Sequence, residues 1–253
     1  MKLNKFFASS LSVVALSASL FAGAHGTHWG YTGHGVPEHW GDLSPEFFMC
    51  KVGANQSPID LVSSDMVTTT SGLDPIKFNY TTKASSVVNN GHTIKVNVKA
   101  GSSIKIDGIT FELKQFHFHT PSENMVEGKH FPLEAHFVHA SKDGKLAVVA
   151  VLFEDGAENK DLKKIWSKMP IESGKTAGCG LPANMINELL PTDKAYYRFD
   201  GSLTTPPCSE GVRWFVMQNY SHISKAQVKQ FEDVMHGHDN RPVQPLNARK
   251  ILK

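Results

Sequence analysis

Two short stretches rich in histidine, residues 115–119 (QFHFH) and 134–139 (EAHFVH), constrain the fold of this chain more than any other feature. Successive side chains of a β-strand point to opposite faces of the sheet, so His117 and His119 share one face. The same alternation places His136 on one face of the second stretch. Because the intervening residues are rich in turn formers, the pattern predicts a hairpin that pairs the two strands.

Three imidazoles on one face of two paired strands can converge on a metal ion. Three histidine ligands with a fourth position left open are typical of catalytic zinc, whereas structural zinc takes four protein ligands. The alternative is a set of buried histidines bonded to backbone groups. An H-x-H pair with a third histidine at strand spacing favours the metal, and we predict a Zn²⁺ site at His117, His119 and His136.

The first 24 residues have the pattern of a cleaved secretory signal peptide. Lys2 and Lys5 form a basic start, an apolar stretch follows, and Ala22-Gly-Ala24 offers a cleavage site. An uncleaved anchor is disfavoured, because the apolar stretch is short and rich in serine. We therefore expect a periplasmic or secreted protein with no stable membrane anchor and a single domain, residues 25–253.

The mature chain is expected to be nearly neutral. Removal of the signal peptide takes two lysines, so Lys plus Arg falls from 26 to 24 and equals the 24 Asp plus Glu. This balance gives no reason to expect nucleic acid or an anionic membrane as a partner. Whether the chain forms a homo-oligomer is left open by the sequence.

Short strand-like runs dominate the rest of the chain and predict a mainly β fold. They lie at residues 86–88, 93–98, 103–106, 110–118, 133–139, 147–153 and 212–217. Two segments have helical patterns instead, an apolar stripe over 162–169 and a capping-box signal at Ser224 and Gln227. We expect these helices to pack against the sheet.

Three cysteines suit an exported protein. Cys50 and Cys208 both lie among turn residues, and a bridge between them would close a long loop. Three cysteines allow three single bridges, however, and the residues alone do not choose among them. If Cys50 pairs with Cys208, Cys179 is left as a shielded thiol or as half of an intermolecular bridge.

Seven segments, in order along the chain, resemble the α-class carbonic anhydrases, in particular the exported bacterial type. The landmarks are His28-Trp-Gly-Tyr31, Gln56-Ser-Pro-Ile-Asp60, Asn89-Asn-Gly-His92, the two histidine stretches, Gly201-Ser-Leu-Thr-Thr-Pro-Pro207 and Arg241-Pro-Val-Gln-Pro-Leu246. The resemblance runs from about His28 to Leu252. It implies a single large twisted, mostly antiparallel sheet with short peripheral helices. It also implies the family's activity, the reversible hydration of carbon dioxide to bicarbonate and a proton.

The resemblance implies that His117, His119 and His136 bind Zn²⁺. As is known for carbonic anhydrase itself, zinc lowers the pKa of its bound water to about 7, so that hydroxide attacks CO₂ near neutral pH. Gln115 and Glu134 are implied to accept hydrogen bonds from the ligand imidazoles and to fix their orientation. Strand alternation independently places each of them on the face of its ligand.

The remaining roles also follow from the resemblance. Thr204 is implied to orient the hydroxide and to give its own proton to Glu123, and Thr205 to contact bicarbonate. His92 is implied to be the proton shuttle, which suits a side chain with an unperturbed pKa of about 6.5. The implied apolar wall for CO₂ consists of Val138, Val148, Leu203, Val212 and Trp214.

The family pattern further implies cis peptide bonds at Ser57-Pro58 and Pro206-Pro207, and a disulfide between Cys50 and Cys208. Lys95 is a departure, because many animal members carry an uncharged polar residue at this cavity position. The difference bears on the water network of the shuttle and on inhibitor preference. His139 falls on the face opposite the ligands, so we expect it to be structural.

Three other interpretations use the same residues. A cupin site would take Glu123 as a further ligand, but Phe111 and His130 stand where its motif requires glycine. A non-catalytic carbonic-anhydrase-like binding protein is disfavoured, because the chain keeps all three ligand histidines. Metal scavenging would use other histidines, for which exposure is the simpler explanation: His25, His28, His34, His39, His236 and His238.

Overall fold

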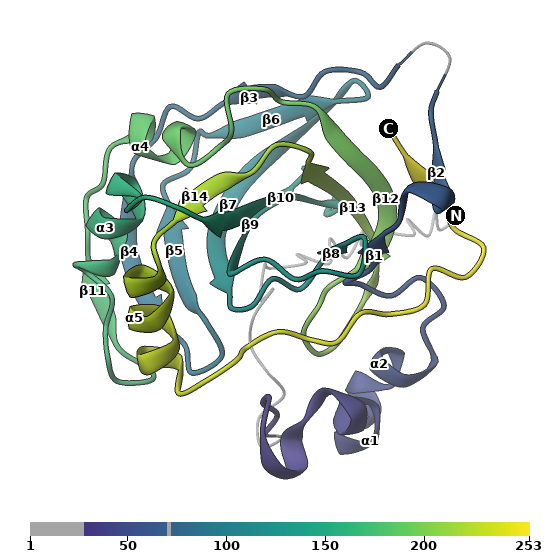
Figure 1. The fold of residues 1–253 in the computed structure, drawn as a ribbon, viewed down its shortest axis with the longest axis horizontal. Helices are drawn as coiled ribbons and strands as arrows, with labels where there is room; N and C mark the ends of the chain where they lie inside the picture. The colour runs from purple at the N-terminus through teal and green to yellow at the C-terminus, as the bar shows by residue number, and fades with distance from the viewer. Residues whose placement is uncertain (1–27, 70–71) are drawn as a thin grey trace, which may run out of the picture.

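The structure is a computed structural model that describes residues 28–69 and 72–253 (Figure 1). The strands are β1 (Asp60–Leu61), β2 (Met66–Val67), β3 (Lys77–Asn79), β4 (Ala84–Asn89), β5 (Ile94–Val98), β6 (Ser103–Ile106), β7 (Ile109–His119), β8 (Met125–Val126), β9 (Leu133–Ala140), β10 (Leu146–Asp155), β11 (Thr176–Gly178), β12 (Tyr196–Ser202), β13 (Glu210–Met217), β14 (Ser221–Ile223) and β15 (Ile251–Leu252). The α-helices are α1 (Trp40–Leu43), α2 (Met49–Val52), α3 (Lys160–Trp166), α4 (Ala183–Glu188) and α5 (Lys225–Met235). Short 3₁₀ turns are η1 (Gly33–Gly35), η2 (Pro37–His39), η3 (Pro45–Phe47) and η4 (Ser63–Asp65).

In the described part of the chain, 13 strands form one large sheet, with short helices around it (Figure 1). The main strand order is β11-β4-β5-β7-β9-β10-β13-β12-β15-β2, and β3, β6 and β14 pair off this path. Most neighbours are antiparallel, while β10–β13, β10–β14 and β15–β2 are parallel. The predicted mainly β, mostly antiparallel fold with peripheral helices is confirmed.

The predicted pairing of the two histidine strands is also confirmed. Strands β7 and β9 are antiparallel neighbours at the middle of the sheet, with His117 opposite His136 and His119 opposite Glu134. The register shifts between Leu113 and Gln115, where a bulge precedes the ligand segment. Side chains directly opposite on one face lie about 4.5–5.5 Å apart at Cβ, so this register brings the imidazoles together.

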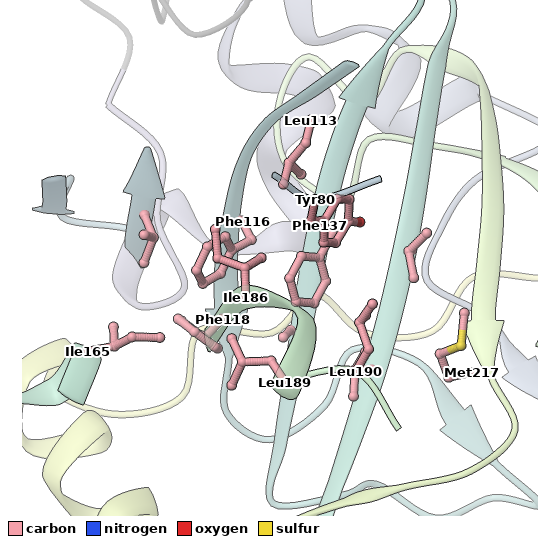
Figure 2. Close-up of a cluster of buried hydrophobic side chains, with 14 of the residues drawn as sticks. Tyr80, Leu113, Phe116, Phe118, Phe137, Ile165, Ile186, Leu189, Leu190 and Met217 are labelled. Atoms are coloured by element: carbon pink, nitrogen blue, oxygen red, sulfur yellow. The ribbon is translucent and has the colours of Figure 1, made fainter. Parts of the chain in front are cut away.

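The opposite face of the same two strands is anchored in the main hydrophobic core. Phe116, Phe118 and Phe137 are fully buried there, and Figure 2 shows them among aliphatic side chains from neighbouring elements. The rings of Phe116 and Phe137 stack with centroids 5.1 Å apart. Burial of each such ring contributes about 1.5–3 kcal/mol, which holds the ligand strands in a rigid layer.

Both predicted helices are present and pack against this core. Ser224 caps α5 in a capping box, in which its hydroxyl accepts the N–H of Gln227 and its own N–H is bonded by the Gln227 side chain. The Trp166 indole of α3 donates to the carbonyl of Gln227 at 2.9 Å, so the two helices lie side by side outside the sheet (Figure 1). Phe231 of α5 is fully buried on the same side.

All seven predicted strand-like runs fall on strands, although Thr93 lies just before the start of β5. The sequence pattern missed the short strands β1, β2, β3, β8, β11, β14 and β15 and, among the longer strands, β12. This strand ends in Asp200-Gly-Ser202, residue types that are poor strand formers, and is held by its pairing with β13. Both predicted cis bonds are present, together with a third at Thr120-Pro121. The predicted signal peptide lies outside the described residues. Within the described ranges, no helix combines the length and apolar character needed to cross a membrane.

Candidate metal centre

The three predicted ligands converge on one point. One ring nitrogen from each of His117, His119 and His136 lies within 4.8 Å of the other two. Their ring centroids are 4.8 to 5.3 Å apart. His119 and His136 are buried, and His117 is partly exposed toward a cavity. Among the described residues, these three histidines form the one group of at least three His, Cys, Asp or Glu side chains that could hold a metal ion.

Hydrogen bonds fix the tautomers of His117 and His119. Nδ1 of His117 lies 2.9 Å from Oε1 of Gln115, and Nδ1 of His119 lies 2.7 Å from the carbonyl oxygen of Asp239. These oxygens can only accept, so both Nδ1 atoms carry the proton and both Nε2 atoms present a lone pair. Nε2 of His119 is buried without a hydrogen-bond partner, as expected for an atom that binds a cation.

His136 is oriented in the opposite sense by Glu134. Its Nε2 lies 3.1 Å from Oε1 of Glu134, at an angle outside the hydrogen-bond range. The short distance between Nε2 and the carboxylate oxygen still sets the tautomer, because an oxygen that can only accept favours a proton on Nε2. Nδ1 of His136 is then left for a metal. It faces inward, 3.9 Å from Oε2 of Glu123.

Glu134 is itself held by three donors. Its Oε2 accepts the backbone N–H groups of Glu123 at 2.7 Å and Asn124 at 2.8 Å, and its Oε1 accepts the Asn124 side-chain amide at 2.7 Å. Burial raises the pKa of Glu134, and these hydrogen bonds oppose the rise. One carboxylate therefore positions both a ligand and the segment that carries Glu123.

The three imidazoles are neutral, the form that binds a metal. Burial lowers the pKa of His119 to about 4 and the pKa values of His117 and His136 well below the ordinary value. For His117, mutual repulsion with the other ligands and with Lys95 adds to the effect of burial. A neutral three-nitrogen set with one side open to a cavity fits Zn²⁺.

Glu123 is fully buried behind the ligands. Its Oε1 accepts the backbone N–H of Arg241 at 2.8 Å, and its Oε2 lies 3.6 Å from Nε2 of His119. Burial raises the pKa of Glu123 to about 8, while the Arg241 N–H and the Thr204 hydroxyl lower it. Oε2 of Glu123 is buried without a hydrogen-bond partner of good geometry. Glu123 and Thr204 are nevertheless brought together, as predicted.

The ligands lie in a cavity of about 740 Å³. Thr204 and Thr205 line it together with four of the predicted apolar wall residues, Val138, Val148, Leu203 and Trp214. Val212 is buried in the same apolar cluster but is not among the residues that line the cavity. The cavity thus has an apolar wall beside the ligands and two threonines in its lining.

His92 also lines the cavity, but its environment differs from a solvated histidine. Its ring stacks on Trp29, with centroids 3.7 Å apart and planes 7° apart. Burial lowers the pKa of His92 to about 4, and the charge of His28 adds to this. In this stacked position the imidazole accepts a proton poorly near neutral pH.

The predicted disulfide is present and restrains the threonine loop. Cys50 and Cys208 are bridged, with their Cα atoms 4.9 Å apart, and Cys179 is a free, half-buried thiol. The N–H of Cys208 donates to the carbonyl of Thr205 at 2.9 Å. The bridge therefore ties the loop that carries Thr204 and Thr205 to the segment around α2.

Sequence reasoning missed three residues of the site. Asp239 accepts from His119 through its carbonyl, and its Oδ1 accepts the N–H of Thr120 at 2.7 Å. Asn124 holds Glu134, as described above. Arg241 is buried and donates to Gln56 and to two backbone carbonyls. Of these three residues, only Arg241 was marked by a sequence pattern, because it is the first residue of a landmark segment.

Comparison with known proteins identifies the family. Residues 35–253 match the model of the eukaryotic-type carbonic anhydrases. The chain belongs to the α-class carbonic anhydrase family. It is 48% identical to a carbonic anhydrase of Neisseria gonorrhoeae over 246 residues, which are 96% of this chain and 95% of that protein.

Solved structures of carbonic anhydrases and their relatives share the fold. The α-carbonic anhydrase of Thermovibrio ammonificans, solved with the inhibitor sulfanilamide, has 53% identity and a TM-score of 0.87, and covers 90% of this chain and 100% of that one. Dioscorin, solved in complex with ascorbate, has 34% identity and a TM-score of 0.81, and covers 89% of this chain and 97% of that one. The resemblance read from the sequence segments is confirmed.

Proposed function

We propose that this carbonic anhydrase family member is a zinc enzyme that catalyses the reversible hydration of CO₂ to bicarbonate and a proton. The observation that carries the proposal is the convergence of three neutral imidazoles, each with a lone pair turned inward, beside an apolar cavity wall. Bound Zn²⁺ would supply Lewis-acid activation of water near neutral pH. His117 and His119 would hold it through Nε2, and His136 through Nδ1.

Thr204 and Glu123 orient the nucleophile in this mechanism. The Thr204 hydroxyl directs its proton toward the buried carboxyl of Glu123, which leaves its oxygen lone pairs for the cavity. The oxygen then accepts a hydrogen bond from the attacking group and aims it at the CO₂ carbon. Thr205, which also lines the cavity, contacts the bicarbonate product.

CO₂ is uncharged and a weak hydrogen-bonding partner, so its site is the apolar wall beside the ligands. Val138, Val148, Leu203 and Trp214 form this wall, and Val212 supports it from within the same cluster. The wall excludes water from the position that CO₂ occupies.

His92 carries the released proton to the solvent. Because the stacked ring has a pKa of about 4, the role requires the imidazole to leave Trp29. Contact with water returns its pKa toward about 6.5, which matches a donor that titrates near neutrality. The ring takes up the proton in the water-exposed position and releases it to the solvent when it exchanges between this position and the stacked one.

The protein functions in an oxidising compartment, the periplasm or the extracellular space. The Cys50–Cys208 disulfide supports this, because such bridges persist outside the cytoplasm. Residues 1–24 act as a cleaved signal peptide in this proposal, and residues 25–253 form the single mature domain. The expected partners are CO₂ and bicarbonate.

Stopped-flow CO₂ hydration by zinc-loaded protein tests the function, with His119→Ala as the ligand variant and His222→Ala, an exposed histidine, as the control. Wild type and His222→Ala should bind one tight zinc per chain and turn over CO₂, while His119→Ala loses both. Zinc binding without turnover in wild type would favour a non-catalytic binding protein. Several weak metal ions per chain would favour a scavenger.

A further inference from the structure

Lys95 lies in the same row of the sheet as two of the ligands. Across strands β5, β7 and β9, Lys95 is opposite His117, and His117 is opposite His136. Directly opposite residues have Cβ atoms about 4.5–5.5 Å apart. The side chain is half-buried and lines the cavity.

The Lys95 side chain brings a positive charge to the cavity lining beside the ligand row. Of the described residues that line the cavity, Glu46 and Lys95 have side chains that ordinarily carry a full charge, and Glu46 is exposed. The buried Glu123 and Glu134 line no part of the cavity. A small anion that enters therefore meets a positive charge inside the cavity, beside the ligand row.

We propose that the ammonium of Lys95 determines specificity for charge in this cavity, raising its affinity for small monovalent anions such as bicarbonate. The proposal rests on the proposed function. CO₂ carries no charge and gains no direct Coulomb attraction. For an anion held at a separation on the order of 10 Å, Coulomb's law gives a gain in affinity of roughly twofold at the dielectric constant of water and about 15-fold at that of a protein surface.

The test is calorimetric titration of zinc-loaded protein with azide, at one pH and one ionic strength. Lys95→Met removes the charge and keeps a flexible stem, and Lys95→Arg keeps the charge. Lys99→Met removes one positive charge from an exposed position just after β5 that does not line the cavity. The Kd for azide should rise roughly twofold to 15-fold in Lys95→Met. It should stay near the wild-type value in Lys95→Arg and Lys99→Met.

Zinc content and thermal unfolding, measured on each variant, show whether the fold and the metal site are intact. If Lys95→Met fails to fold, Lys95→Gln takes its place. An unchanged Kd in the uncharged variant overturns the proposal, and so does equal weakening in Lys95→Arg, which would indicate shape rather than charge. The proposed function stands or fails on CO₂ turnover by wild type, so the two failures are distinguishable.

Discussion

Replacement of Glu134 by glutamine tests how His136 is held in its metal-binding tautomer. The change keeps the shape of the side chain and turns one acceptor oxygen into a donor NH₂ group. All the groups that face the carboxylate are donors: two backbone N–H groups, the Asn124 amide, and Nε2 of His136. No placement of the new amide satisfies all of them.

The magnitude follows from which donors lose their acceptor. With the amide oxygen placed toward the backbone N–H groups, the NH₂ group faces Asn124 and His136. His136 relieves the conflict by moving its proton to Nδ1, which removes the lone pair that the metal needs. Loss of such a supporting partner costs roughly 10- to 100-fold in metal affinity, about 1.4–2.7 kcal/mol. The unpaired Asn124 amide costs a further 1–3 kcal/mol or so of stability.

Competitive zinc titration against a chelating dye measures the first effect, and urea unfolding of the metal-free protein measures the second. Glu112→Gln is the matched control, because Glu112 lies on β7 and pairs with Lys114 at a partly exposed position. This variant should behave as wild type. The reasoning is refuted if Glu134→Gln folds normally and binds zinc within about twofold of wild type, far less than loss of a supporting partner costs.

Three further perturbations have defined outcomes. Replacing Cys50 and Cys208 by serine removes a bridge with a sequence separation of 158, and urea unfolding should show a loss of up to about 5 kcal/mol; a loss below about 1 kcal/mol would contradict the chain-entropy argument. His139 is bonded to the Tyr80 hydroxyl and burial lowers its pKa to about 3, so it contributes stability above pH 6.5 that is lost as the pH falls toward 3. In His139→Gln, the slope of unfolding free energy between pH 4 and 6 should be smaller than in wild type by about 1.4 kcal/mol per pH unit, and parallel curves would exclude a neutral buried imidazole. His92→Ala should slow CO₂ turnover at low buffer concentration and recover with added imidazole; unchanged turnover would remove the shuttle role.

The ligand set and its supporting side chains were predictable because strand alternation is local. Gln115 and His117 are two residues apart on one strand, as are Glu134 and His136, and the period of two places each pair on one face whatever the rest of the fold does. The buried phenylalanines of the opposite face follow from the same period. Helix α5 was predictable because its capping box is also local.

Other parts of the site were not predictable from pattern. The acceptor for His119 is a backbone carbonyl 120 residues away, and every residue has such a carbonyl. Val212 has the composition of a wall residue, but only packing decides that it lies within the cluster rather than at the cavity surface. The depressed pKa of His92 comes from its stacking and burial, which the isolated residue does not reveal.

The sequence by itself therefore determined the two strands, their three histidines, the face that they share and, through its segments, the family. The tertiary structure alone decided the nitrogen that each histidine turns inward, the donors that hold Glu134, and the place of Lys95 beside the ligand row. The physical reason is how far apart along the chain the interacting groups lie. Side-chain alternation depends on adjacent residues, whereas tautomer, burial and field depend on groups that only the folded sheet brings within a few ångströms.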